Sequence, residues 1–310
     1  MQAKRYDVVA LGEAMLEFNQ TRPGELQYLQ GYGGDTSNAV IAAARAGAAT
    51  AYLTRVGNDW FGERLRALWA QEGVDASGVE TDATRNTGIY FVNHGAAGHA
   101  FSYLRAGSAA SAMTPEWLPL ELVRAARILH VSGISLALSA SARQTVLAAM
   151  RAARAANTLV AFDSNLRLKL WTLEQARVGI TEAVGLCDLF LPSVEDMEAL
   201  LGLSDADAIV DWGHARGAKS VVLKLGARGC LASDGRERTL IAGRPSTLVD
   251  ATGAGDCFCG NLLARLAAGD SLFEAARFAN TAAALAVQGF GAVAPLPTLA
   301  EVRSALANGW

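Results

Sequence analysis

A glycine-rich segment near the C-terminus holds the residue types that phosphate chemistry requires. Gly253, Ala254 and Gly255 follow an apolar run that ends at Val249, and apolar residues then recur at helical spacing up to Gly269. The segment therefore predicts a turn that opens a helix. Helix N-termini attract anions, and glycine lets a ligand approach the backbone N–H groups closely. We expect these three residues to form an anion hole.

An acidic residue lies in the same turn. Its negative charge would repel a phosphate, so binding of phosphate alone does not explain it. Asp256 directly follows Gly255. An acid beside an anion hole is explained if it accepts the proton of a hydroxyl group that attacks the bound phosphate. The alternative is structural: a glycine turn followed by an acid that caps the helix. Spacing alone leaves both interpretations open, and Asp256 is the candidate catalytic base.

A second glycine-rich segment, GYGGDTSN at residues 31–38, precedes an alanine-rich helix expected at 39–47. It lacks the Gly-x-Gly-x-x-Gly spacing of a dinucleotide-binding loop. The amide of Gly34 and the side chains of Asp35 and Asn38 offer a donor and acceptors that suit sugar hydroxyl groups. A plain loop at a helix start is the structural alternative.

Two expected β-strands, 87–93 and 100–105, flank a turn and form a hairpin. Tyr103 and Arg105 lie two residues apart, so they share one face, which Tyr90 can join across the strand pair. The group suits an anionic, hydroxylated ligand. An exposed amphipathic hairpin would show the same pattern.

Polar residues also follow two expected parallel strands, at the sheet edge where α/β proteins bind ligands. The first group is FDSNLRLKLW, residues 162–171, in which Arg167 can clamp a carboxylate or phosphate. The second comprises Ser193, Glu195 and Asp196, whose carboxylates suit Mg²⁺ held through water. Turn caps and acids in a first helical turn explain both groups equally well.

A strand, a glycine turn and another strand are expected around Lys224, Gly226 and Gly229. A glycine-lined backbone can approach nucleotide phosphates or ribose closely. An ordinary β-hairpin is the alternative.

The elements that must position these groups alternate between strand and helix. Buried strands are expected at 6–11, 51–56, 128–131, 158–162, 188–191 and 220–225. The alternation predicts an α/β fold with a doubly wound, mostly parallel sheet flanked by helices. Two β-rich pieces, about 14–34 and 86–106, are expected to pair into a small sheet that acts as a lid. We therefore expect residues 1–310 to form a single domain with that β lid.

The composition is that of a globular protein of 310 residues, with 51% hydrophobic residues and a formal net charge of −3. Neither a nucleic-acid nor a membrane partner is expected from this charge. The uncharged, largely apolar stretch 128–142 is too short and too polar to span a bilayer, and no signal peptide is visible. The four cysteines form no Cys-x-x-Cys pair, which favours unpaired thiols and a reducing cytoplasm.

Taken in order along the chain, these segments resemble the ribokinase (PfkB-type) family of carbohydrate kinases. The stretch DATGAGD, residues 250–256, is similar to the family signature, and the resemblance covers nearly the whole chain. The segments at 33–38, 103–105, 132–137 and 163–171 are most similar to the 2-keto-3-deoxygluconate kinases of that family. The resemblance implies transfer of the γ-phosphate of ATP, with Mg²⁺, to a primary hydroxyl of a 2-keto-3-deoxy sugar acid.

By matching position, the resemblance also assigns roles to individual residues. It makes Asp256 the base and the Gly-Ala-Gly turn the anion hole. The residues implied to bind the sugar acid are Gly33, Gly34, Asn38, Tyr90, Tyr103, Arg105, Asn165, Arg167 and Asp256. Those implied to bind ATP are Ser193, Lys224, Gly226, Arg228, Gly229, Gly253, Gly255 and Asn280. A homo-oligomer formed through the lid is a further option.

Three features depart from the family pattern, and one of them, Asp250-Ala-Thr in place of Asp-Thr-Thr, is expected to matter little. Ser193-x-x-Asp196 stands where Asn-x-x-Glu is usual, so the acid that orders Mg²⁺ stays open between Glu195 and Asp196. The acids Glu13 and Glu17 fit the sugar-binding Asp of the family only loosely, and the expected site leaves them out.

Other functions stay open at this point. A fructokinase or a keto-deoxygalactonate kinase is the alternative within the family. A nucleotide-binding oxidoreductase would require a Gly-x-Gly-x-x-Gly loop that the chain lacks. A catalytically silent sugar-binding regulator would have no need of Asp256.

Overall fold

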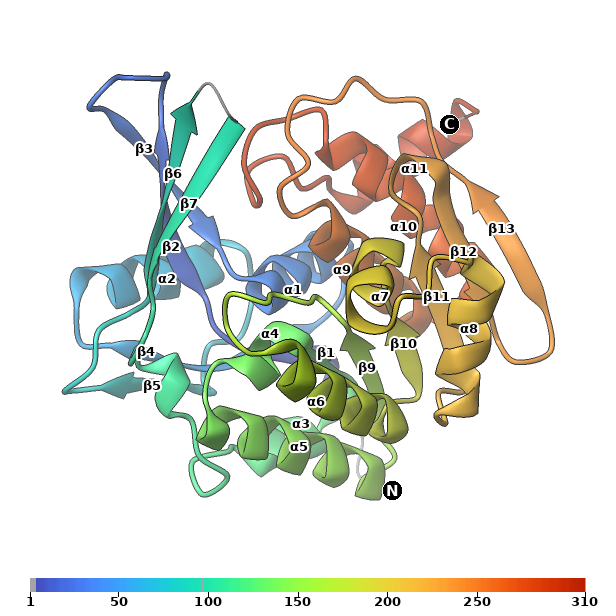
Figure 1. Ribbon diagram of the computed structural model, residues 1–310, viewed down its shortest axis with the longest axis horizontal. Coiled ribbons are helices and arrows are strands. Elements are labelled where there is room, and N and C mark those ends of the chain that lie inside the picture. The colour runs from blue at the N-terminus through green and yellow to red at the C-terminus, as the bar shows by residue number, and fades with distance from the viewer. Residues whose placement is uncertain (1–3, 96–97, 310) are drawn as a thin grey trace.

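The computed structural model describes residues 4–95 and 98–309 (Figure 1). Its large sheet consists, in order across the sheet, of β13 (Arg238–Ala242), β12 (Gly229–Ser233), β11 (Ser220–Lys224), β10 (Leu189–Leu191), β9 (Leu159–Asp163), β8 (Ala126–Ser132), β1 (Tyr6–Leu11), β4 (Thr50–Gly57) and β5 (Val79–Asp82). Neighbouring strands from β11 to β5 run parallel, and β12 and β13 add an antiparallel edge. The predicted mostly parallel sheet is confirmed.

Helices cover both faces of this sheet. One face carries α1 (Asp35–Arg45), α2 (Trp60–Gln71), α9 (Ala254–Ala267), α10 (Leu272–Ala286) and α11 (Leu299–Ala307). The other carries α3 (Leu120–Arg124), α4 (Gly133–Ala137), α5 (Ala140–Ala155), α6 (Leu173–Leu186), α7 (Val194–Leu201) and α8 (Ala206–Ala215). The predicted doubly wound arrangement is therefore confirmed.

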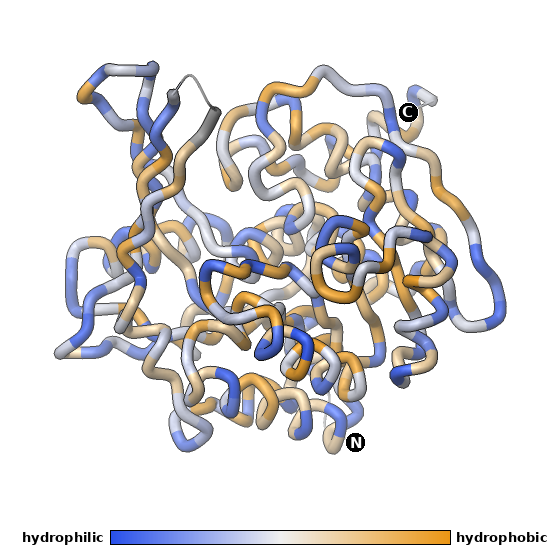
Figure 2. Tube along the Cα trace, in the orientation of Figure 1, coloured by the Kyte–Doolittle hydropathy of each residue, from blue (hydrophilic) through white to orange (hydrophobic). Residues whose placement is uncertain are grey.

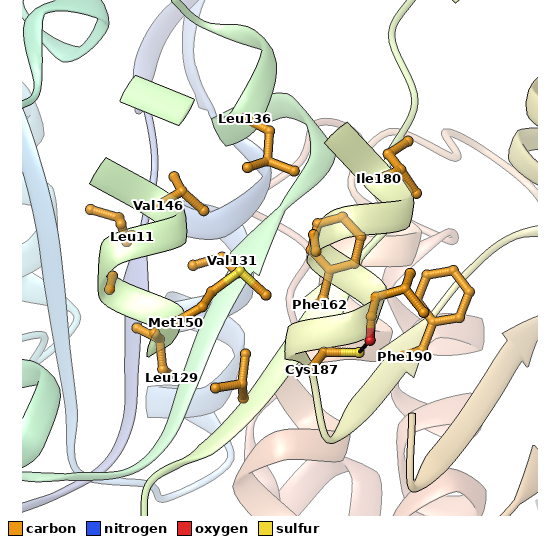
Figure 3. Close-up of a cluster of buried hydrophobic side chains, with 14 of the residues drawn as sticks. Leu11, Leu129, Val131, Leu136, Val146, Met150, Phe162, Ile180, Cys187 and Phe190 are labelled. Atoms are coloured by element: carbon orange, nitrogen blue, oxygen red, sulfur yellow. Dashed lines mark hydrogen bonds between the residues drawn. The ribbon is translucent and has the colours of Figure 1, made fainter. Parts of the chain in front are cut away.

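Alternation along the strands supplies a hydrophobic core to each face, because successive strand residues point to opposite sides. Val8 and Ile128 pack with α1, α9 and α10, whereas their neighbours Val9 and Leu129 pack with helices of the other face. Figure 3 shows this second core, where Leu129 and Val131 of β8 lie against Val146 and Met150 of α5. In Figure 2 the turn that joins β12 and β13 is one of the hydrophilic stretches at the periphery of the molecule.

A separate small sheet stands at one side of the molecule (Figure 1). Its order is β3 (Tyr28–Gly33), β2 (Met15–Gln20), β6 (Ile89–Gly95) and β7 (Gly98–Leu104), with β2 and β6 parallel and the other pairs antiparallel. The predicted hairpin turn includes residues 96 and 97, which lie outside the described residues. The division into one domain with a mobile lid stays a prediction.

Some elements differ from the prediction. The helix expected from residue 39 already begins at Asp35, so Asn38 lies in its first turn rather than in a loop. Gly34 is the N-cap and adopts a φ of 116°, which suits glycine. The strand β5 and the helices α3 and α4 were not predicted, because elements of four or five residues are too short to show a period.

Cys187, Cys230, Cys257 and Cys259 are unpaired and buried. Within residues 4–95 and 98–309, no helix has the length and hydrophobicity that crossing a membrane would require.

Candidate active site

A cleft of about 1660 Å³ lies at the carboxyl ends of the central strands, where strand ends, the small sheet and the first turns of α1 and α9 meet. The predicted residues that line it are Gly33, Gly34, Asn38, Tyr90, Tyr103, Arg105, Asn165, Arg167, Ser193, Glu195, Asp196, Lys224, Gly226, Gly229, Gly253, Ala254, Gly255, Asp256 and Asn280. Arg228 does not line it. The fold thus brings nearly all of the predicted site into one cleft.

The Gly-Ala-Gly turn forms the N-terminus of α9. Gly253 is the N-cap, with a left-handed φ of 75°, and no side chain of the described residues caps the helix. Asp250 stabilises the preceding loop, since its Oδ1 accepts hydrogen bonds from the backbone N–H of Thr252 at 2.9 Å and from its hydroxyl at 2.7 Å. A side chain built on Gly255 would meet only Lys224 Nζ, at 3.7 Å. The N–H of Ala254 donates to the Ala251 carbonyl at 3.2 Å, whereas those of Gly253 and Gly255 have no backbone acceptor among the described residues and remain accessible to a ligand in the cleft.

The carboxylate of Asp256 lies in the same turn and is half-buried. Its Oδ2 accepts a hydrogen bond from Asn38 Nδ2 at 2.9 Å. Burial and then the negative charge of Asp35 raise the pKa of Asp256 to about 7, against the opposing effect of the Asn38 hydrogen bond. A carboxylate with a near-neutral pKa is suited to general base catalysis.

Asp35, which the sequence indicates only as an acceptor for sugar hydroxyl groups, is buried next to the candidate base Asp256. Its Oδ2 accepts a hydrogen bond from Asn165 Nδ2 at 3.1 Å, and burial raises the pKa of Asp35. Oδ1 of Asp35 and Oδ1 of Asn38, one helical turn apart, have no hydrogen-bond partner among the described residues. Buried acceptors without donors are costly, so both atoms are suited to bind hydroxyl groups of a substrate. The Asp-x-x-Asn spacing at a helix start was the signal for this pair.

The small sheet contributes two stacked tyrosines. Tyr90 and Tyr103 pair directly across β6 and β7, with ring centroids 5.5 Å apart. The hydroxyl of Tyr90 donates to Glu17 Oε2 at 2.5 Å, and burial raises the pKa of Glu17. A side chain on Gly33 would overlap the Tyr90 hydroxyl, which explains the glycine there. Glu17 therefore fixes Tyr90 from behind the cleft.

The guanidinium of Arg105 is already engaged by a carboxylate. Its Nε donates to Glu13 Oε2 at 2.7 Å, its Nη2 contacts the same oxygen, and the hydroxyl of Ser108 donates to Oε1. Glu13 lines the cleft with a fully buried side chain, although the expected site omitted it. A buried carboxylate requires such a cation. A bidentate clamp by Arg105 on a substrate carboxylate would therefore have to compete with Glu13.

Of the two arginines predicted to bind a substrate carboxylate, Arg167 is the one that remains available. It is exposed in the loop after β9, and Nη1 donates to the Leu166 carbonyl at 2.8 Å. Within the described part of the chain it forms no ion pair, and it lines the cleft. Its position suits an anionic group of a ligand.

Glu195 and Asp196, which follow β10, lie in the first turn of α7. Ser193 caps α7 by accepting a hydrogen bond from the backbone N–H of Asp196 at 3.1 Å, and Asp196 accepts one from the Ser164 hydroxyl at 2.7 Å. Burial raises the pKa of Asp196. No group of three or more His, Cys, Asp or Glu side chains in the described residues could hold a metal ion. Glu195 and Asp196 thus fit an ion held largely by water and phosphate, as Mg²⁺ often is.

The far end of the cleft is formed by the β11–β12 hairpin, the loop that follows β13, and α10. Gly229 has a φ of 97°, and Asn280 Nδ2 donates to the Ala242 carbonyl at 2.7 Å. Arg228 does not line the cleft, whereas Arg244 does. The Nε atom of Arg244 is buried and has no hydrogen-bond partner among the described residues. The loop that carries Arg244 shows no hydrophobic period and no motif, so no sequence pattern indicated this residue.

Comparison with known proteins identifies the class. The model of the pfkB family carbohydrate kinases matches residues 5–299, and the chain belongs to this family. It is 33% identical to fructokinase-1 of Zea mays, over 97% of this chain and 98% of that protein. It is 32% identical to 2-dehydro-3-deoxygluconokinase of Bacillus subtilis (strain 168), over 97% and 96%. The structure of fructokinase with bound ATP from Xylella fastidiosa superposes with a TM-score of 0.90 at 25% identity, covering 98% of this chain and 99% of that one.

The predicted class of enzyme, a carbohydrate kinase, is thereby confirmed, and the oxidoreductase alternative is wrong. The substrate is a separate matter. 2-Dehydro-3-deoxygluconokinase is another name for 2-keto-3-deoxygluconate kinase. This relative and the fructokinase are similar to the chain to almost the same degree, so the comparison does not choose between their substrates.

Proposed function

We propose that the protein transfers the γ-phosphate of ATP to a primary hydroxyl of a sugar acid, converting 2-keto-3-deoxygluconate to 2-keto-3-deoxy-6-phosphogluconate. The observation that carries the proposal is the placement of Asp256, with its raised pKa, in the first turn of a helix whose N–H groups open into the cleft. The ATP bound to the related Xylella fastidiosa fructokinase supports the donor. The Bacillus subtilis relative supports the acceptor.

In the proposed mechanism, Asp256 accepts the hydroxyl proton as the hydroxyl oxygen attacks the γ-phosphorus. The bond from that phosphorus to the oxygen bridging to the β-phosphate breaks, and ADP leaves with the electron pair. The N–H groups of Gly253 and Gly255 bind the transferring group, and one such donor is worth about 3 kcal/mol. Mg²⁺, ordered by Glu195 or Asp196 through water, offsets phosphate charge when it is bound.

The remaining residues orient the acceptor and enclose the cleft. Asp35 and Asn38 each accept a hydrogen bond from a substrate hydroxyl, which satisfies their unpaired oxygens. Closure of the small sheet over the strand ends excludes water and limits ATP hydrolysis. We further propose a cytoplasmic location, where ATP is available and thiols stay reduced. The exposed residues Leu29 and Leu104 of the small sheet provide the surface for the predicted homo-oligomer.

The pH dependence tests the base. Asp256 works as the carboxylate, and its pKa is raised to about 7, so lower pH protonates it and removes activity. We expect kcat/KM to be constant at high pH and to fall to half of that plateau near pH 7. One pH unit lower, it should be roughly a tenth of the plateau value. Asp35→Asn should move this half-point to lower pH, because the negative charge of Asp35 raises the pKa of Asp256. A half-point near pH 4 in the wild type would contradict a perturbed base.

The charge of the substrate tests Arg167. In Arg167→Ala, kcat/KM for 2-keto-3-deoxygluconate should fall roughly 10–150-fold, since a charge-assisted hydrogen bond is worth about 1.5–3 kcal/mol. The fall for fructose should be much smaller, because fructose leaves no carboxylate unpaired. Arg167→Lys is the matched control and should rescue only in part, since an ammonium cannot reproduce the planar fork. Equal losses for acid and neutral sugars would show that Arg167 serves phosphate or structure.

Phosphorylation of a neutral ketose is the second candidate function. It is favoured by the ion pair between Arg105 and Glu13, which neutralises one of the two guanidiniums expected to bind a carboxylate. A panel of fructose, 2-keto-3-deoxygluconate and 2-keto-3-deoxygalactonate with Mg-ATP, followed by ADP release, separates the candidates. A preference for fructose would replace the sugar-acid assignment, and no ADP release with any of them would favour a silent sugar-binding regulator.

A further inference from the structure

A buried ion pair joins two strands at the floor of the cleft. Lys224 Nζ, at the end of β11, donates to Asp163 Oδ2, at the end of β9, at 2.7 Å. The side chains are only 15% and 3% exposed. The thiol of Cys259 on α9 donates to the same oxygen at 3.3 Å, and Oδ1 accepts the backbone N–H of Asn165 at 3.1 Å. The carboxylate of Asp163 is therefore held from three sides.

This pair lies beside the anion hole. A Cβ built on Gly255 would lie 3.7 Å from Lys224 Nζ, so the ammonium is adjacent to the first turn of α9. Lys224, Asp163 and Gly255 all line the cleft. Burial lowers the pKa of Lys224, but the charge of Asp163 and neighbouring groups raises it by more, so the ammonium stays protonated.

The geometry also sets how many donors Lys224 retains. An ammonium has three N–H groups. One is bonded to Asp163, and a second faces Cys259 Sγ at 3.8 Å. The third has no partner among the described residues and is available to a ligand in the cleft. Because the lysine stem is long and flexible, the ammonium needs such partners to stay in one place.

We propose that Asp163 is a positioning residue that holds the Lys224 ammonium beside the Gly253–Gly255 turn, where Lys224 binds the phosphoryl group during transfer. The inference rests on the proposed kinase function and deepens it. The floor of the cleft carries the carboxylates of Asp35, Asp163 and Asp256, which repel a phosphate. A fixed ammonium among them offsets that repulsion at the place where the charge of the transferring group develops.

A double-mutant cycle, run well above pH 7 so that the effect of Asp163 on the pKa of Asp256 does not enter kcat, tests whether Asp163 acts on the phosphoryl group through Lys224. Lys224→Met should lower kcat by on the order of 100-fold, and Asp163→Asn by on the order of 10-fold, with the KM for the sugar nearly unchanged. Asp163→Asn in the Lys224→Met background should lower kcat no further. The Tm of the double variant should exceed that of Lys224→Met alone, because the single variant leaves the charged Asp163 buried without a cation.

The matched control is Asp188→Asn. Asp188 pairs with Lys219 at 2.8 Å at the opposite end of the sheet, before β10 and β11, so kcat should stay at the wild-type value. If Lys224→Met fails to fold, Lys224→Gln enters the same cycle. Additive losses in the double variant, wild-type kcat in Asp163→Asn, or a loss confined to the KM for the sugar would each overturn the proposal. A wild-type protein that phosphorylates no sugar would instead refute the proposed function, so the two failures are distinguishable.

Discussion

Asp256→Asn is expected to lower kcat by about 10²–10⁴-fold, the usual contribution of a general base. The substitution keeps the size of the side chain, and an amide oxygen can still accept the hydrogen bond from Asn38 Nδ2. What is lost is the capacity to bind the hydroxyl proton during attack on phosphate. Steady-state kinetics with Mg-ATP and the preferred sugar measure the change.

The same variant should keep its fold. The pKa of Asp256 is raised in the folded state, so the charged carboxylate destabilises the protein progressively as pH rises above the unfolded pKa, and fully above about pH 7. An uncharged amide removes this penalty, so the Tm at pH 8 should be equal to or above that of the wild type. Asp270→Asn, which breaks the ion pair with Arg265 near the C-terminal end of the same helix, should leave kcat unchanged. If Asp256→Asn kept more than about a tenth of the wild-type kcat, another group would be the base.

The fold was largely predictable because its strands are buried on both faces. Nearly continuous apolar runs such as YDVVAL at residues 6–11 are typical of strands in a sheet that helices cover on both sides. The first turn of α1 was missed for a physical reason. Asp35 and Asn38 are buried polar residues, and hydrophobic periodicity does not register polar residues that face a cleft.

The sequence predicted which residues line the site, but it did not predict which of them form ion pairs with one another. Motif spacing located Arg105 and Lys224, whereas the acids that hold them, Glu13 and Asp163, lie 92 and 61 residues away along the chain. Nothing in a sequence specifies which of 30 acidic residues meets a given cation, because the sheet order decides it. The structure therefore changes the expected chemistry: of the two arginines predicted to bind a carboxylate, Arg105 is a paired cation and Arg167 is available to an anionic substrate.

The glycines of the turn provide the second large effect. Gly255→Val is expected to lower kcat/KM by about 10²–10³-fold, the cost of losing a donor from an oxyanion hole. The new side chain would point toward Lys224 Nζ and occupy the space beside the first-turn N–H groups. Since Gly255 has no positive φ and its Cβ would meet nothing closer than 3.7 Å, we expect little change in Tm. Thermal unfolding and kinetics on one preparation measure both quantities.

Gly253→Ala is the control that separates catalysis from folding. Gly253 has a φ of 75°, and a Cβ there would lie 3.0 Å from Ala292, so the substitution imposes backbone strain of about 1–2 kcal/mol and contact with a neighbouring loop. Its Tm should fall, because the left-handed N-cap suits glycine alone. The two variants thus alter the same turn by different physical means. A Gly255→Val protein with lowered Tm and intact kcat/KM would make the turn a structural helix start, and the anion hole would have to lie elsewhere in the cleft.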